Sequence, residues 1–575
     1  MLIAFVLGLT ALINYYVVFP IFLNPLIKQG IPGPWHYKLT RFFILNITRR
    51  EKRLETLQKL HEKYGPVVMV GPNEVSLNSL DLVKKVYLGN YPKEFKNSDG
   101  TVKGFYSQFG NYGETNMFTI GENREHLQQK RQLQKLYSNS SIKCSQAFIR
   151  AKVLEVVKKI EIIGYGKNVE VGSLFTSLAM DVVSGFNYGS KLSSTFVNDL
   201  AHTAVDLNLS ENLFSSFRAT TSMWFYTTLM PSLWAPVARL YGIDKRAELG
   251  AQWIYDNFAK GMDLLVAEES VDVAQFPLNS VIAKMWETAS EKRYHNGPEK
   301  IDLTSGVPPF NYKVSGMTTR DTNKIASEIA DHIVAGHETT GVTLTYIAWE
   351  LSRPVNFIWR EKLRQELRGT RSLICEELEN LPVLGAIISE SLRLHAAIPG
   401  SEPRFVPRGQ ALKTTVAGCQ VEIPEGTIVA CQPWTLHRQA VFGANPERFK
   451  PARWLQQPEE PEQEFKQRLK AMHSNMFVFG EGNRMCLGMH LALAEIRMVT
   501  AAIYSRFETT VSPDWCPIID SDDTPVKLGY GALSTRTRST DYHKMPDIDK
   551  MAMADSYVTR PMFDECWLRF EPFSD

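Results

Sequence analysis

The 575-residue chain has the composition of a folded protein, and its charge argues against a nucleic-acid partner. Hydrophobic residues make up 44% of the sequence and charged residues 22%, which argues against global disorder. The formal net charge is only +2, whereas nucleic-acid binding by a whole domain requires a strongly basic face. The seven cysteines are odd in number and include no C-x-x-C pair, so they indicate a reducing compartment and neither a disulfide framework nor a zinc site.

The N-terminal residues 2–27 carry no charged side chain and are mostly Leu, Ile, Val, Phe, Tyr and Ala. This stretch exceeds the roughly 20 residues that a membrane-spanning helix needs, and it lacks the basic start and cleavage site of a signal peptide. Basic residues follow from Lys28 onward and would hold the rest of the chain on the cytosolic face. The sequence therefore predicts a transmembrane anchor at 2–27, in contact with lipid, and a stiff proline-rich hinge at 28–36. The alternative is a buried core helix, although such helices are usually shorter and carry a polar face.

Several further elements can be predicted from hydrophobic periodicity and from turn residues. Two short strands between residues 64 and 77 are joined by Gly71-Pro72-Asn73 and form a hairpin. The segment 95–121 is rich in Gly, Asn and Ser, which indicates a long loop. We expect helices at 148–159 and 174–186, followed by a stretch dense in aromatic residues at 213–234. A surface loop is expected at 290–320 and a final hairpin at 520–533.

The most informative stretch is residues 479–488, which read FGEGNRMCLG and lead into an amphipathic run at 487–507. Cys486 is therefore expected in a glycine-shaped turn at the start of a helix. Unpaired backbone N–H groups and the helix dipole at that place favour the thiolate, the form of cysteine that binds metals. The alternative is a buried free cysteine that packs as a small hydrophobic residue.

This string resembles the haem-binding signature of the cytochrome P450 family, F-x-x-G-x-R-x-C-x-G, at every specified position. The resemblance implies that Cys486 is the axial thiolate ligand of the iron of haem b. It also implies that Arg484 faces a haem propionate and that Phe479 packs near the sulfur side of the ring. Gly480 and Gly488 would let the flat cofactor approach the backbone.

A predicted long helix at 321–353 contains AGHETT at residues 335–340, which resembles the oxygen-binding motif of the family. The resemblance implies that the hydroxyl of Thr339 bonds oxygen, and this hydroxyl can also bond back to a helix carbonyl. Glu338 would feed protons inward as a general acid. The glycine of the motif is expected to let the helix backbone lie against the haem.

Glu390 and Arg393 lie three residues apart in a predicted helix at 381–394 and so share one helix face. In the family, such a pair is buried and is joined by an arginine of a downstream F-x-P-x-R segment. Both Arg448 and Arg453 are candidates, and the spacing of residues 449–454 fits the full pattern better, so we assign Arg453. The implied role of this charged network is structural.

Further resemblances concern the haem propionates. Arg404 resembles a strand arginine that binds one of them. In the run that begins at His126, either Lys130 or its neighbour Arg131 would make another such contact. His437 belongs to a tract common in the family and is expected near the haem edge.

The four motifs occur in the family's order and imply one mainly α-helical domain with a small β region at 37–535, enclosing a single haem. The implied enzyme is a monooxygenase that inserts one atom of O₂ into an apolar small molecule, with electrons from NADPH through an NADPH-cytochrome reductase. Similarity to fungal members suggests secondary metabolism, with a polyketide, terpenoid or alkaloid substrate, at the cytosolic face of the endoplasmic reticulum membrane. Residues 536–575 have no counterpart and are expected to be a flexible appendage or a mistake in the gene model.

Two other functions remain open from the sequence. One is a haem-thiolate isomerase or dehydratase that needs no external electrons, and the other is a non-catalytic haem sensor. The Glu338–Thr339 pair favours monooxygenation over both, because only that reaction needs delivery of protons to oxygen.

Overall fold

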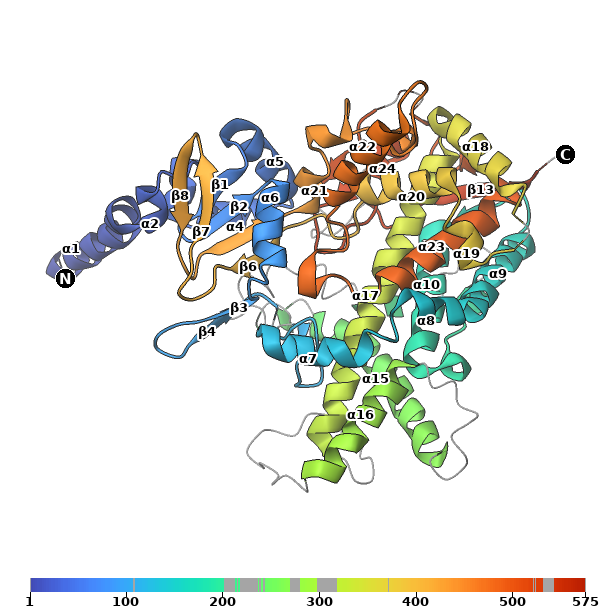
Figure 1. Cartoon of the computed structure of the whole chain (residues 1–575), viewed down its shortest axis with the longest axis horizontal. Helices are drawn as coiled ribbons and strands as arrows, with labels where there is room; N and C mark the ends of the chain where they lie inside the picture. Colours follow the sequence, from blue (N-terminus) through green and yellow to red (C-terminus); the bar gives the residue numbers. More distant parts are fainter. Residues whose placement is uncertain are drawn as a thin grey trace.

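The computed structural model describes residues 2–106, 109–200, 213–214, 216–217, 236, 239–240, 243–268, 280–296, 318–370, 372–520, 522, 524–530 and 542–573. Within these residues the chain is mainly α-helical, with small sheets gathered largely beside the N-terminal segment (Figure 1). This confirms the predicted fold class. Most of the aromatic stretch at 213–234 and of the predicted loop at 290–320 lies outside the described residues.

Helices and strands from all parts of the chain position the site. The helices are α5 (Arg53–Tyr64), α7 (Asn123–Leu133), α9 (Gln146–Ile163), α10 (Val171–Tyr188), α15 (Ile243–Glu268), α16 (Val281–Asn296), α17 (Thr319–Ser352), α18 (Phe357–Leu367), α19 (Cys375–Leu378), α20 (Pro382–Leu394), α22 (Glu462–Ser474), α23 (Met489–Tyr504) and α24 (Asp547–Lys550). The strands are β1 (Val67–Gly71), β2 (Glu74–Leu77), β3 (Glu94–Lys96), β4 (Val102–Gly104), β5 (Asn168–Glu170), β6 (Glu402–Phe405), β7 (Leu412–Val416), β8 (Cys419–Ile423), β9 (Ile428–Cys431), β10 (Phe507–Val511), β11 (Leu528–Gly529), β12 (Met553–Ala554) and β13 (Trp567–Pro572).

Helix α17 runs through the middle of the molecule for 34 residues and is buried along most of its length (Figure 1). Thr318 caps its N-terminus, where the side chain accepts a bond from the backbone N–H of Asp321 at 3.1 Å. The helix ends at Ser352, just before Arg353 and Pro354. It packs against α10 and α23, so it forms the wall on which the core is assembled.

Two glycines let α17 and α10 approach each other closely. A Cβ atom on Gly336 would lie 2.5 Å from Cγ2 of Val183, and one on Gly341 would lie 2.7 Å from Oγ1 of Thr176. Both contacts are closer than side-chain atoms tolerate. The expectation that Gly336 serves contact with the haem is therefore wrong, because this glycine faces α10.

A four-stranded sheet in the order β1-β2-β9-β6 places Arg404. Strands β1 and β2 form the predicted hairpin, with Val67 opposite Leu77. Strand β9 runs parallel to β2 and antiparallel to β6, with Arg404 opposite Val429. The sheet thereby holds Arg404 in a buried position at one end of the helical body.

The C-terminal residues 542–573 are built into the fold, so the expectation of a flexible appendage is wrong for them. Strand β13 lies between β10 and β5 and pairs antiparallel with both. In α24, the carboxylate of Asp547 accepts a bond from Nε1 of Trp349 at 3.0 Å and lies 3.4 Å from Nε of Arg353. The hairpin expected at 520–533 is also absent from the described residues there, where β11 instead pairs in parallel with β12.

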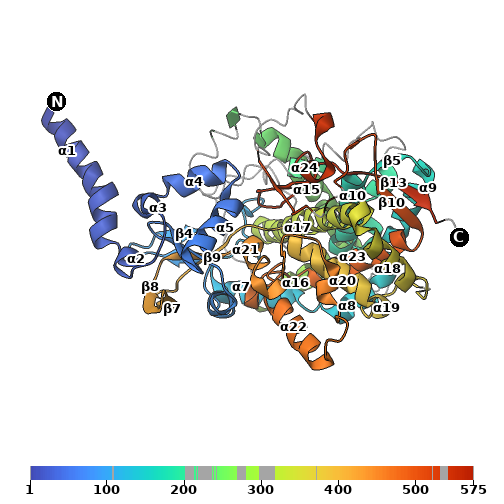
Figure 2. The same cartoon turned by 90° about the horizontal axis from the view of Figure 1, so that it is seen from above.

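The N-terminal segment projects away from the helical body (Figure 2). Helix α1 (Leu2–Ile13) continues directly into the π-helix η1 (Asn14–Leu23). Among the residues that the structure describes, no single helix has both the length and the apolar character needed to cross a membrane.

Candidate active site

Glycines shape the loop that carries Cys486. Gly480 and Gly482 have φ values of 69° and 71°, in the left-handed region that favours glycine. A Cβ atom on Gly482 would also lie 2.3 Å from the carbonyl oxygen of Tyr87. The backbone N–H of Cys486 donates to the carbonyl of Phe479 at 2.8 Å and closes the loop. Helix α23 then begins at Met489, two residues later than predicted.

Gly488 differs from the other glycines of the loop. Its φ is −81°, which any residue can adopt, so the backbone conformation does not require glycine here. No heavy atom of the described residues lies within 4 Å of the position where its Cβ would be. The glycine therefore leaves open space beside the cysteine.

The thiol of Cys486 is accessible, yet it is surrounded by enough protein for burial to raise its pKa above the ordinary value. The N–H groups of Gly488 and Met489 and the cation of Lys130 act in the opposite direction but do not outweigh burial. The helix N-terminus therefore acts in the predicted direction, but the prediction that the pKa is lowered overall is wrong for the protein alone, because burial outweighs this effect. A metal cation removes the proton from a coordinating thiol outright, so the finding is compatible with a metal ligand.

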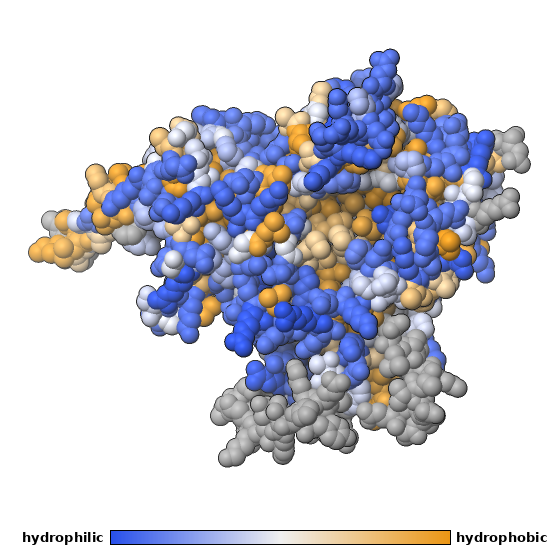
Figure 3. All heavy atoms as spheres, in the orientation of Figure 1, coloured by the Kyte–Doolittle hydropathy of each residue, from blue (hydrophilic) through white to orange (hydrophobic). Residues whose placement is uncertain are grey.

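One face of α17 is open in the middle of an otherwise buried helix. Asp331, Ala335 and Thr339 are spaced four residues apart on this face, and Ala335 is exposed while the other two are partly exposed. The hydroxyl of Thr339 donates to the carbonyl of Ala335 at 2.7 Å, which is the back-bond that the sequence predicts. Glu338, also named from the motif, is buried. Figure 3 shows a hollow with apolar walls near the middle of the face drawn, in the region of α17.

Positive side chains from separate segments gather near the loop. They are Arg404 from β6, Arg484 from the loop itself, Lys130 from α7 and Lys93 from the segment before β3. Burial, together with the charge of Arg404, lowers the pKa of Arg484 to about 10. Burial and the two arginines also lower the pKa of Lys93 well below its ordinary value. This mutual repulsion is costly for the protein alone and favours the binding of an anion.

His126 lies beside these cations. Burial and then the charges of Arg484 and Lys93 lower its pKa to about 3, so the ring is neutral. Its Nδ1 atom is buried and makes no hydrogen bond to any described residue. A buried, unsatisfied ring nitrogen among four cations fits the two carboxylates of a haem, and the accessible thiol fits its iron. The residues present therefore match the cofactor that the sequence motif implies.

The structure distinguishes between Lys130 and Arg131. Nζ of Lys130 donates to the carbonyls of Asn483 and Met485 at 2.7 and 2.8 Å, within the cysteine loop. Arg131 is exposed. The guanidinium of Arg484 donates to the carbonyls of Ile120 and Gly121 at 2.7 and 2.8 Å, so it ties the cysteine loop to the segment before α7.

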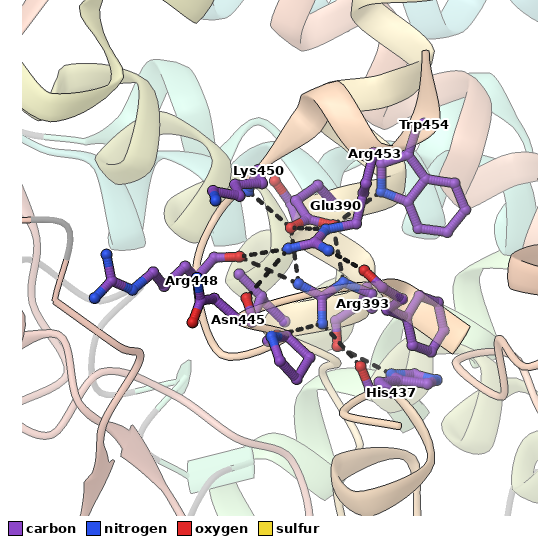
Figure 4. A network of polar contacts seen from close by, with 12 residues as sticks. Glu390, Arg393, His437, Asn445, Arg448, Lys450, Arg453 and Trp454 are labelled. Carbon is purple, nitrogen blue, oxygen red and sulfur yellow. Dashed lines mark hydrogen bonds and ion pairs between the residues drawn. The ribbon is translucent and has the colours of Figure 1, made fainter. Parts of the chain in front are cut away.

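The predicted charged network is formed and buried (Figure 4). The two carboxylate oxygens of Glu390 accept from Nη2 and Nε of Arg393 at 2.7 and 2.8 Å. Nε of Arg453 donates to Glu390 at 2.9 Å, and so does Nε1 of Trp454. Arg448 contributes its carbonyl, which accepts from both arginines at 3.3 Å. The arginine that joins the pair is therefore Arg453, as assigned from the sequence.

His437 connects this network to the segment that leads to the cysteine loop. Its Nε2 accepts from the backbone N–H of Phe477 at 2.8 Å, so Nδ1 carries the proton and donates to the carbonyl of Arg393 at 3.0 Å. Burial is the main reason that its pKa falls to about 3. The ring is therefore a neutral bridge between α20 and the segment that leads to Cys486.

Two polar residues of the site were missed by the sequence analysis, namely Lys93 and Tyr106. Nζ of Lys93 lies 4.0 Å from the ring centre of Tyr106 and donates to the carbonyl of Phe118 at 2.8 Å. Both residues lie in or beside a segment without periodicity, where no motif marks them. The only available signal was a lysine close to a cluster of aromatic residues, which is too common to select it.

Comparison with known proteins agrees with this geometry. The family model described as cytochrome P450 matches residues 301–530. A cytochrome P450 monooxygenase of Aspergillus niger is 26% identical over 492 residues, which cover 84% of this chain and 86% of the relative. The chain is thus similar to the cytochrome P450 family over most of its length. P450 monooxygenases from Aspergillus hancockii and Pyricularia oryzae are also similar, each at 26% identity. Both alignments cover 85% of this chain, and they cover 86% of the Aspergillus hancockii protein and 85% of the Pyricularia oryzae protein.

As a P450 monooxygenase, the protein is an oxidoreductase that holds haem iron through an axial thiolate and receives electrons from NADPH through a redox partner.

Proposed function

We propose that this P450 inserts one oxygen atom into a largely apolar small molecule of fungal secondary metabolism, in the polyketide, terpenoid or alkaloid class. The observation that carries the proposal is the accessible thiol of Cys486 together with the open face of α17 at Ala335 and Thr339. The structure also contains a pocket that is partly open to solvent, and its lining does not include Cys486, Ala335 or Thr339. Its lining includes Phe105, Phe109, Ile398 and Ile428.

The bound haem supplies activation of O₂ and transfer of one oxygen atom, and the chain supplies binding, orientation and protons. In this proposal the sulfur of Cys486 is the axial ligand, Phe479 packs beside it, and the backbone at Gly480 and Gly488 leaves room for the ring. Arg484, Arg404 and Lys130 neutralise the propionates, whereas the exposed Arg131 has no part in the site.

Protons reach the site through α17. The hydroxyl of Thr339 donates to a carbonyl of its own helix, so its oxygen can accept a proton donor while the hydrogen stays engaged. The carboxyl of Glu338 lies one residue earlier in the chain and is proposed to supply protons to this hydroxyl. Glu390, Arg393 and Arg453 hold the surrounding loops and do not take part in the reaction.

We further propose that residues 2–27 anchor the protein in the endoplasmic reticulum membrane. Helices α1 and η1 follow each other without a break, and large apolar side chains such as Ile3, Leu7 and Phe22 are 65–77% exposed. Such exposure is unfavourable in water and is relieved by lipid. The hinge at 28–36 would join this anchor to a catalytic domain that begins at residue 37 and faces the cytosol. Deleting residues 2–27 should move the protein from the membrane fraction to the supernatant, and retention in the membrane fraction would refute the anchor.

Turnover with and without a reductase tests the reaction. The full-length protein should consume NADPH and form an oxygenated product only when a P450 reductase is present. Product without NADPH would instead support an isomerase or dehydratase, and haem binding without any product would support a sensor.

The ligand assignment is tested by Cys486→Ala. This variant should lose the absorption band near 450 nm of the reduced carbon monoxide complex, because that band requires a thiolate ligand. Cys375→Ala removes a different thiol, which is buried in α19, and should keep the band. A normal band in Cys486→Ala would exclude Cys486 as the ligand.

A further inference from the structure

The partly open pocket is lined by segments that lie far apart in the sequence. Phe105 and Phe109 come from the loop before α7, Ile428 from β9, and residues 555–557 from the C-terminal segment. The ring of Phe105 stacks on that of Phe405 in β6, with 4.9 Å between the ring centres, so this wall is fixed on the sheet. Most of the lining side chains are apolar or aromatic, which suits the hydrocarbon part of an organic molecule.

Charged side chains line another part of the same pocket. They are Arg41, just before α4 (Phe42–Arg49), Arg53 at the start of α5, Glu74 of β2, and Asp555. Oε1 of Glu74 accepts from Nη2 of Arg53 at 2.6 Å, and Oε2 of Glu74 accepts from Nη2 of Arg41 at 3.3 Å. Two guanidinium groups therefore share the single charge of this carboxylate.

The carboxylate of Asp555 has a partner of its own. Its Oδ2 accepts from the backbone N–H of Leu54, in the first turn of α5, at 2.9 Å. There it satisfies an N–H group that the helix cannot pair and lies at the positive end of the helix dipole. Within the part of the chain that the structure describes, Asp555 forms no ion pair with either arginine. Its charge is thus engaged by the helix.

Arg41 has hydrogen-bonding capacity that the protein leaves unused. Its Nε atom is buried and makes no hydrogen bond to any described residue. Arg53, in contrast, also donates to the hydroxyls of Thr48 and Ser401, both at 3.4 Å. The side chain of Arg41 is 37% exposed and that of Arg53 is 10% exposed, so Arg41 is the more accessible cation. A buried donor without an acceptor is unfavourable, and an acceptor on a ligand relieves this cost.

Two sets of contacts place the pocket beside the proposed active site. The hydroxyl of Tyr106, which lines the pocket, accepts from Nη1 of Arg404 at 3.4 Å. The carbonyl of Phe109 accepts from Nδ2 of Asn116 at 3.0 Å, and the same Nδ2 lies 3.5 Å from Oγ of Ser327 in α17. A molecule in the pocket therefore lies near a cation assigned to the haem and near the helix that carries Thr339.

From this pocket, with its apolar walls and the unused donors of Arg41, we infer that the substrate is an organic acid and that Arg41 binds its carboxylate. The inference rests on the proposed function and narrows its substrate class. A guanidinium binds a carboxylate through paired, charge-assisted hydrogen bonds. The apolar body of the acid lies against the aromatic walls and extends toward α17. Arg41 is thus a specificity-determining residue for the monooxygenation.

Two probes of similar shape and different charge test the inference, namely 6-phenylhexanoate and its neutral analogue 6-phenylhexanamide. Binding of each probe to the full-length haem protein is measured by isothermal titration calorimetry at pH 7.5. The acid should bind roughly tenfold more tightly than the amide, because hydrogen bonds to a charged group are about twice as strong as those between neutral groups.

The substitution Arg41→Gln removes the charge and leaves Glu74 paired with Arg53. It should remove the preference for the acid and change the affinity for the amide by less than about threefold. Arg49→Gln is the matched control, since Arg49 is an exposed arginine in the last turn of α4 and does not line the pocket. This variant should keep the wild-type preference.

A change of opposite sign is expected at Asp555. Asp555→Asn removes a negative charge from the pocket and keeps a side-chain oxygen for the N–H of Leu54. It should strengthen binding of the acid by roughly two- to fivefold and leave binding of the amide unchanged. Absence of this gain would mean that the acid does not lie in the charged part of the pocket, and it would overturn the inference.

The absorption spectrum of the haem, followed in the same titration, distinguishes a substrate from a ligand at a remote site. The haem band should shift as the acid fills the site, and tight binding without a shift would overturn its assignment as substrate. Equal affinities of the wild-type protein for acid and amide would also overturn the inference, and so would a preference that survives Arg41→Gln. The proposed function is judged separately, by the carbon monoxide spectrum and by NADPH-dependent product, and it can stand without the acid site.

Discussion

The hydroxyl of Thr339 lies on the open face of the central helix α17. Because it bonds the carbonyl of Ala335 at 2.7 Å, its hydrogen is held in place while its oxygen remains available. Thr339→Ala removes this oxygen, so the variant should consume NADPH but release peroxide, and the yield of product per NADPH should fall roughly tenfold or more. The measurement compares NADPH consumed, peroxide formed and product formed.

Thr343 offers a matched control for this prediction. Its hydroxyl makes the same kind of bond, to the carbonyl of Thr339 at 2.8 Å, but its side chain is buried. Thr343→Ala should therefore keep the wild-type ratio of product to NADPH. Unchanged coupling in Thr339→Ala would remove the role proposed for that hydroxyl.

At the scale of individual residues, the sequence was informative where a residue belongs to a recognisable motif. The assignments of Cys486, Thr339 and Arg453 came from the resemblance to family motifs, and the structure shows Arg453 bonded to Glu390. The pKa of Cys486 could not be predicted in this way, because the free energy of burying a thiolate depends on all surrounding residues, whereas the sequence reveals only the helix N-terminus.

The buried carboxylate of Glu390 joins α20 to the segment that contains Arg453. Nε of Arg453 donates to it, whereas Arg448 offers only a backbone carbonyl to the network. Arg453→Met leaves Glu390 short of one cation and should lower the free energy of unfolding by about 3–5 kcal/mol. Arg448→Met should cost about 1 kcal/mol or less. Urea unfolding followed by tryptophan fluorescence measures both, and equal losses would contradict the assignment of Arg453.

The stability of the contact between α20 and the segment that leads to Cys486 should also depend on pH. The neutral ring of His437 joins Arg393 to Phe477, and its pKa is about 3 in the folded protein, against about 6.5 for an ordinary histidine. The unfolded chain therefore binds more protons below pH 6.5, and the stability that this residue provides is lost as the pH falls from there toward 3. The slope is about 1.4 kcal/mol per pH unit.

The variant His437→Gln isolates this contribution from carboxyl groups that titrate in the same range. Its thermal midpoint should lie below that of the wild type at pH 7.5, and the gap should narrow as the pH falls to 5. The exposed residue His543 serves as the control, since His543→Gln should leave the midpoint unchanged at every pH. If the difference in thermal midpoint between wild type and His437→Gln did not change with pH, the lowered pKa of His437 would be contradicted.

Elements defined by local patterns were predicted well. The helices expected at 381–394 and 321–353 correspond to α20 and α17, and the first hairpin is present. Pairings between distant segments were not predicted. Strand β13 alternates buried Leu568 and Phe570 with more exposed neighbours, but its partners β5 and β10 lie far earlier in the chain, and periodicity does not identify a partner.

On the scale of the whole molecule, the C-terminal segment closes the fold. Deleting residues 542–575 removes β13 from between β5 and β10 and removes the carboxylate of Asp547 from Trp349 and Arg353. This truncation should prevent accumulation of folded haem protein, because it exposes two strand edges and leaves a buried arginine with one carboxylate fewer.

A second truncation supplies the control. Deleting only residues 574–575 leaves β13 complete and should give the wild-type yield and carbon monoxide spectrum. The two proteins are compared by soluble yield and by the ratio of haem absorbance to protein absorbance. Normal haem content after deletion of 542–575 would show that the segment is dispensable for folding.

The place of β13 in the sheet also has a consequence for biosynthesis. Strand β5 is translated roughly 400 residues before its partner, and a ribosome adds about 5–20 residues per second, so the early strand waits for about 20 s or longer. The sheet can therefore be completed only once β13 has left the ribosome, and until then β5 lacks its partner strand.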